Sequence, residues 1–92
     1  DCSEGSRLGD ACAFFERATH TVCIDHHLTN GGFAEYSYII PDDSSTCELI
    51  YNQFGKDKIT KDIAECLYLG IIHDITDKSI AAAGDKEVHI WY

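Results

Sequence analysis

Apolar residues recur at helical spacing in three stretches of the chain. The first stretch predicts an amphipathic helix from Arg7 to about Ala18, with Ser6 as its N-cap. The second begins at a capping-box sequence, residues 45–48, and Gly55 is the residue expected after its end. A third helix is predicted after Thr60. The apolar stripes comprise Leu8, Ala11, Cys12, Phe15 and Ala18 in the first helix and Cys47, Ile50, Tyr51 and Phe54 in the second.

The third helical stretch places an acid on its apolar face. Ile63, Leu67 and Gly70 share one side of the predicted helix. Continuing the same spacing along that side reaches Asp74. The alternative is that the helix stops near Ile72, which would leave Asp74 as an exposed residue beyond the helix end.

Two other stretches have the composition of strands. Residues 20–24 form a short β-branched run with apolar side chains on both faces, which is typical of a central parallel strand. Residues 33–40 are rich in aromatic and β-branched side chains and end at Pro41, so a second strand is predicted there. Asn30, Gly31 and Gly32 lie between the two runs as a turn.

The order of these elements predicts an α/β fold, with a mostly parallel sheet and helices packed on it. A chain of 92 residues is one domain at most. Residues 75–92 carry a thinner pattern and stay unassigned. Within them, residues 80–83 suggest a short helical turn, and residues 87–92 alternate as an edge strand would.

Composition narrows the classes of function. The net charge of −9 argues against unaided binding to nucleic acid or to an anionic membrane, and a phosphate substrate would need cations. No stretch is apolar enough for a membrane span. Five widely spaced cysteines without a C-x-x-C pair indicate reduced, buried thiols of a cytoplasmic protein.

Asp25, His26 and His27 directly follow the first predicted strand. Ligands of open α/β sheets bind at the carboxyl ends of strands, and a carboxylate beside two imidazoles suits a divalent cation or a phosphate. A zinc site of His20 and Cys23 with the two histidines is the competing interpretation. Residues three apart on a strand point to opposite faces, which disfavours it.

Four segments together resemble the catalytic domain of DHH-family phosphoesterases, in the correct order and spacing. The resemblance spans residues 1 to about 74, which we take as a partial DHH catalytic domain. It is similar to the RecJ-like group, which includes nanoRNases, phosphoadenosine-phosphate phosphatases and cyclic-dinucleotide phosphodiesterases. The segments are Asp1–Asp10, Cys23–Asn30, Ser44–Tyr51 and Ile59–Asp74.

The resemblance implies roles for five residues. Asp1 matches a carboxylate that bridges two metal ions, His26 a metal-binding histidine, and Asp74 the aspartate of the family's fourth motif. Asp25 would orient His26 or the groups around it, and His27 would face the scissile phosphate. The implied cofactors are two Mn²⁺ or Mg²⁺ ions, which would activate water and clamp a phosphate ester.

The implied activity is hydrolysis of short nucleotide phosphodiesters, such as short oligonucleotides, or of nucleotide phosphomonoesters. Two departures weaken it for this chain alone. The family's first, Asp-rich motif has no counterpart, and Ile75-Thr76-Asp77 follows Asp74 where the family has Thr-Gly. We therefore expect missing N-terminal and C-terminal parts of a parent enzyme to complete the site. The alternatives are a non-catalytic nucleotide- or protein-binding module and a homodimer formed through exposed sheet edges.

Overall fold

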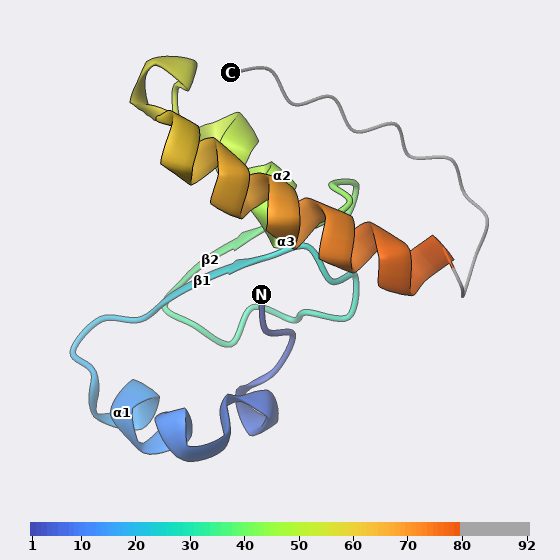
Figure 1. The fold of residues 1–92 in the computed structure, drawn as a ribbon. Coiled ribbons are helices and arrows are strands. Elements are labelled where there is room, and N and C mark those ends of the chain that lie inside the picture. The colour runs from blue at the N-terminus through green and yellow to red at the C-terminus, as the bar shows by residue number, and fades with distance from the viewer. Residues whose placement is uncertain (80–92) are drawn as a thin grey trace. The chain divides into compact units, whose positions relative to one another are not determined.

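The computed structural model describes the backbone of residues 1–79 and the side chains of residues 1–75. The chain separates into two compact units, Asp1–Asp42 and a second that begins at Asp43. Helices precede and follow two consecutive parallel strands, so the fold is α/β, as predicted. Figure 1 shows the two strands side by side. The predicted turn at 80–83 and edge strand at 87–92 lie outside the described residues.

The first predicted helix is two helical pieces rather than one. A 3-10 helix, η1 (Gly5–Ala11), precedes the short α1 (Cys12–Arg17). Gly9 lies between regular helical turns with φ 56° and ψ −132°, which an L side chain rarely adopts and which interrupts the helix. The N-cap is Glu4, not Ser6, and no residue of either piece is buried. The prediction of one continuous helix with a buried stripe is therefore wrong.

The predicted strands form a parallel pair, β1 (Val22–Asp25) and β2 (Tyr36–Ile39), in which Asp25 is the register partner of Ile39. Both are shorter than the sequence suggested. Burial along β1 alternates, with Cys23 and Asp25 buried and Val22 65% exposed. The expectation that both faces of this strand are covered is thus wrong at Val22.

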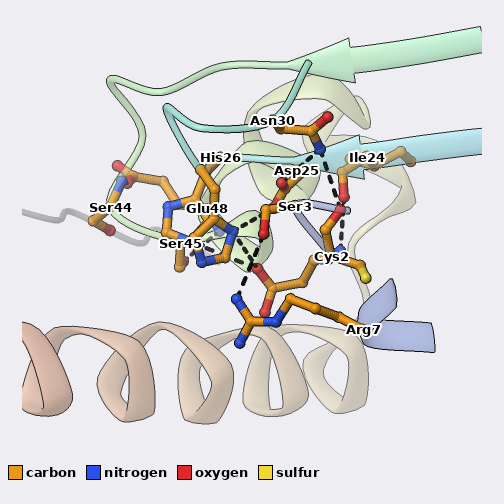
Figure 2. Close-up of polar contacts among 12 residues, drawn as sticks. Cys2, Ser3, Arg7, Ile24, Asp25, His26, Asn30, Ser44, Ser45 and Glu48 are labelled. Carbon is orange, nitrogen blue, oxygen red and sulfur yellow. Dashed lines mark hydrogen bonds and ion pairs between the residues drawn. The ribbon is translucent and has the colours of Figure 1, made fainter. Parts of the chain in front are cut away.

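The second unit begins at the predicted capping box. Helix α2 (Thr46–Gln53) is capped by the Ser45 hydroxyl, which accepts a hydrogen bond from the Glu48 N–H at 3.0 Å. The Glu48 carboxylate accepts from the N–H of Ser44 at 2.6 Å, one residue earlier than predicted. Figure 2 shows these three side chains together.

The end and the buried face of α2 differ from prediction. The helix ends at Phe54, its C-cap, and Gly55 has φ −52°, so no left-handed glycine closes it. Buried residues are Thr46, Leu49 and Tyr51, whereas Phe54 is exposed. Lys56–Lys58 then forms a short 3-10 helix, η2.

Helix α3 (Lys61–Ser79) continues well beyond Ile72, so Asp74 is helical and the alternative of an earlier end is wrong. The Thr60 hydroxyl accepts a hydrogen bond from the Ile63 N–H at 3.3 Å, as expected of its cap. Asp74 is half-buried. The buried face consists of Ala64, Leu67 and Ile71, while Ile63 is exposed.

All five cysteines are free thiols in this structure. Only Cys23 is buried and Cys66 is exposed, so the expectation of uniformly buried thiols is wrong. Among residues 1–79, no helix combines the length and hydrophobicity needed to cross a bilayer.

Candidate metal centre

The site lies at the carboxyl end of β1. The last residue of the strand, Asp25, accepts a ladder hydrogen bond from the Ile40 N–H at 3.0 Å through its backbone oxygen, and its side chain is fully buried. A strand end is where an open α/β sheet presents side chains to a ligand. The chain leaves the strand here, so His26 and His27 follow at this edge.

Three side chains that could hold a cation come together here. Asp1, His26 and His27 each offer one ligand atom, and these atoms all lie within 4.8 Å of one another. Asp1 Oδ1 is 3.6 Å from His26 Nε2 and 3.7 Å from His27 Nδ1. His26 is buried, His27 is half-buried and Asp1 is exposed.

Asp1 reaches the site because its backbone is tied to β1. Its backbone nitrogen donates a hydrogen bond to the Ile24 carbonyl oxygen at 2.8 Å. The Ile24 carbonyl points away from β2, because it is the carbonyl oxygens of residues 21 and 25 that accept hydrogen bonds from the N–H groups of Tyr36 and Ile40. The segment at Asp1 therefore lies along the other side of β1, beside the histidines.

A buried carboxylate fixes the His27 ring. Asp25 Oδ1 lies 2.7 Å from His27 Nδ1. Burial alone would raise the pKa of Asp25, but hydrogen bonds from Asn30, His27 and the His26 backbone outweigh it and lower the pKa to about 2. Because an ionised carboxylate can only accept, His27 Nδ1 carries the proton, and a neutral ring then keeps its lone pair on Nε2.

The second oxygen of Asp25 also has a partner. Asn30 Nδ2 donates to Asp25 Oδ2 at 2.7 Å and to the Cys2 carbonyl oxygen at 3.2 Å, as Figure 2 shows. From the sequence, Asn30 was predicted only as part of a turn. Its position as a polar residue three places after His27 was the one sequence signal for this role.

The donor set fits a divalent cation. One carboxylate oxygen with imidazole nitrogens is a mixture that Mn²⁺, Mg²⁺ and other first-row ions accept to differing degrees. Ligand atoms that each lie about 2.1 Å from an ion are about 3–4 Å apart. The separation of 3.6 Å between Asp1 Oδ1 and His26 Nε2 is in that range and too long for a direct hydrogen bond. His27 can offer an ion only its Nε2, because its Nδ1 proton is held by Asp25.

The predicted site residues divide between the two units. Asp1, Asp25, His26 and His27 meet in the first, with Asp25 hydrogen-bonded to His27 rather than to the His26 ring. Asp74 belongs to α3 in the second, so its part in the same site stays a prediction.

The competing zinc site does not form among residues 1–79. His20 is exposed and lies 3.0 Å from Glu35, and the Cys23 thiol donates to the Cys2 carbonyl oxygen at 3.7 Å. Neither is part of the cluster that could hold a metal.

Comparison with known proteins gives a family match. The DHH family, N-terminal domain, matches residues 1–71. No curated protein and no solved structure matches the chain. Because the match covers most of the 92 residues and includes the Asp1, His26 and His27 cluster, this chain belongs to the DHH family.

Proposed function

We propose that this chain supplies part of the catalytic centre of a divalent-metal-dependent phosphoesterase of the RecJ-like group. The observation that carries the proposal is the cluster of Asp1, His26 and His27 at the end of β1 in a DHH-family chain. DHH proteins are generally metal-dependent phosphoesterases, and the donors gathered here suit such an ion.

In this proposal, Asp1 and His26 hold an ion and Asp74 contributes to the complete ligand set. Two divalent ions, when bound, would supply water activation and would clamp the attacking and leaving oxygens of the ester. Asp25 keeps the His27 ring in one tautomer and one orientation. The Nε2 of that ring is then the nitrogen left to face the scissile phosphate.

The substrate class we propose is short nucleotide phosphodiesters or nucleotide phosphomonoesters. A net charge of −9 gives the chain little intrinsic attraction for such anions. Bound cations would offset this charge where the substrate binds. Mn²⁺ is the proposed ion because it accepts both imidazole and carboxylate ligands, whereas Mg²⁺ prefers oxygen.

Calorimetric titration with Mn²⁺ tests the site. We expect the chain to bind Mn²⁺ in an isotherm that His26→Ala abolishes or weakens at least tenfold, because a ligand is lost. His20→Ala is the matched control, since it removes an exposed imidazole outside the cluster. Equal isotherms for the chain and for His26→Ala would refute the metal site.

Hydrolysis tests the activity. A dinucleotide and 3′-phosphoadenosine 5′-phosphate are each incubated with Mn²⁺ and the longest available form of the protein. The same reactions are run with its His26→Ala variant. Turnover that depends on His26 supports the phosphoesterase. Mn²⁺ binding without turnover of either substrate would instead favour a non-catalytic nucleotide- or protein-binding module.

A further inference from the structure

The Asn30 side chain connects three parts of the first unit. Its Nδ2 donates to the side chain of Asp25 and to the backbone oxygen of Cys2, the residue next to Asp1. Its Oδ1 accepts from the Gly32 N–H at 2.8 Å. We propose that Asn30 is a positioning residue for the candidate metal centre, which orients Asp25 and thereby the His27 ring, and anchors the segment that carries Asp1.

The hydrogen bonds leave no other orientation for the amide. Asp25 Oδ2 and the Cys2 carbonyl are acceptors, so the group that faces them must donate twice. The Gly32 N–H is a donor, so the group facing it must accept. Rotating the amide by 180° would set oxygen against oxygen and N–H against N–H.

Only a carboxamide of this length meets all three demands. An aspartate at position 30 would keep the acceptor for Gly32 but would face the Asp25 carboxylate with a second carboxylate. An alanine would leave the buried Asp25 Oδ2 without this donor, at a cost typical of an unsatisfied buried group. The Cys23 sulfur, 3.4 Å from Asn30 Nδ2, is a weaker additional acceptor.

The backbone of Asn30 fixes where the amide stands. Its N–H donates to the His27 carbonyl oxygen at 3.1 Å, closing a tight turn directly after the histidines. Gly32 follows with φ 77°, a conformation that glycine adopts without strain. The turn therefore places the Asn30 amide against the carboxyl end of β1, directly after which His26 and His27 follow.

The consequence is a relay of two hydrogen bonds from Asn30 to the site. Asn30 holds one oxygen of Asp25 at 2.7 Å, and the other oxygen, also at 2.7 Å, holds His27 Nδ1. Without Asn30, the carboxylate can rotate about its Cβ–Cγ bond and leave the imidazole. The bond of Asn30 to the Cys2 carbonyl oxygen in addition holds the segment that carries the proposed ligand Asp1, and hydrogen bonds that orient ligands commonly change metal affinity by about 10–100-fold.

Two measurements on Asn30→Ala test this inference. Only the second of them, the affinity for Mn²⁺, rests on the proposed function. Long-range ¹H–¹⁵N spectra of the metal-free chain, at about pH 8.5 where an ordinary imidazole is neutral, report the His27 tautomer. We expect the Nδ1–H form to dominate in the unmodified chain and to decline in Asn30→Ala. Calorimetry with Mn²⁺ should show affinity reduced about 10–100-fold.

Asn52→Ala is the matched control, because Asn52 is an exposed residue of α2. It should leave both readouts unchanged. If Asn30→Ala does not fold by circular dichroism, Asn30→Asp replaces it in the tautomer measurement, since it keeps the acceptor for Gly32.

An unchanged His27 tautomer in a folded Asn30 variant overturns the inference, whatever the Mn²⁺ affinity. If the unmodified chain binds no Mn²⁺, the proposed metal site fails. In that case the His27 tautomer is the only test of the role of Asn30. A decline of the Nδ1–H form in the variant supports this role, and no decline overturns it.

Discussion

Asp25 is the most deeply buried charged residue of the first unit. Its side chain is fully buried, yet hydrogen bonds lower the pKa of the group to about 2 despite the opposing effect of burial. A buried charge persists only when its oxygens are matched by donors. Here Asn30 and His27 each provide one such donor at 2.7 Å.

Substitution Asp25→Asn should therefore invert the His27 tautomer. The new amide keeps one oxygen for Asn30 and presents its NH₂ to His27 Nδ1, which must then lose its proton and leave Nε2 protonated. We expect a loss of about 1 kcal/mol in the free energy of unfolding. Long-range ¹H–¹⁵N spectra and urea denaturation measure the two effects.

Asp10→Asn is the control for this substitution, because Asp10 is exposed on η1. It should change neither the spectrum of His27 nor the stability by more than about 0.5 kcal/mol. A His27 ring that keeps its Nδ1 proton in Asp25→Asn would contradict the assigned hydrogen bond.

At the scale of elements, α2 depends on one side-chain cap. The Ser45 hydroxyl is buried and accepts from the Glu48 N–H, whereas Ser6, the cap expected for the first helix, is exposed and is not at the N-cap. We expect Ser45→Ala to lower the free energy of unfolding by about 0.5–2 kcal/mol. Ser6→Ala should change it little, and urea denaturation of both variants gives the comparison.

Helices α2 and α3 approach each other closely at Cys47 and Gly70. A Cβ built on Gly70 would lie 3.2 Å from Cys47 Cβ and nearer still to its sulfur. Gly70→Ala should therefore destabilise the chain by about 1–3 kcal/mol through overpacking, although alanine favours helices. The denaturation midpoint measures the loss.

A double-mutant cycle separates this contact from other effects of Gly70→Ala. In a Cys47→Ala background the sulfur is absent, so the penalty of Gly70→Ala should decrease by more than half. An equal penalty in both backgrounds would show that the cost arises elsewhere. Burial, with a smaller effect from the Asp74 carboxylate, raises the pKa of the Cys47 thiol. A thiol that keeps its proton suits this apolar contact.

At the scale of the whole molecule, acidic charge dominates and the proposed ions act against it. Saturating Mn²⁺ should raise the thermal unfolding midpoint, because an ion that binds only the folded chain stabilises it by about 2.7 kcal/mol at 100 times its Kd. EDTA should reverse the shift. Thermal unfolding of His26→Ala should show a much smaller shift with Mn²⁺ or none, and His20→Ala should behave as the unmodified chain.

A shift of the same size in His26→Ala would mean that Mn²⁺ stabilises the chain through its general negative charge. Raising the salt concentration distinguishes the two cases, since screening weakens diffuse binding to exposed carboxylates more than binding within a cluster. The ion at Asp1 and His26 should persist under these conditions.

Local signals in the sequence correctly predicted the helices with a side-chain cap and the strands rich in β-branched and aromatic residues. The cap at Ser45, the cap at Thr60 and the parallel strand pair are confirmed. The helix predicted from residue 7 to residue 18 was wrong because the conformation of Gly9 interrupts it. Helical periodicity does not report a single residue with positive φ.

The sequence by itself determined the α/β class and placed a carboxylate and two imidazoles at a strand end, because these follow from short-range patterns. The family resemblance implied that Asp1 and His26 share a metal site, but only the tertiary structure gave the contact that brings them together, the hydrogen bond of Asp1 to Ile24. It also decided that Asp25 and Asn30 act together. Such contacts join residues far apart in the chain or depend on side-chain orientation, and neither leaves a periodic signature in the sequence.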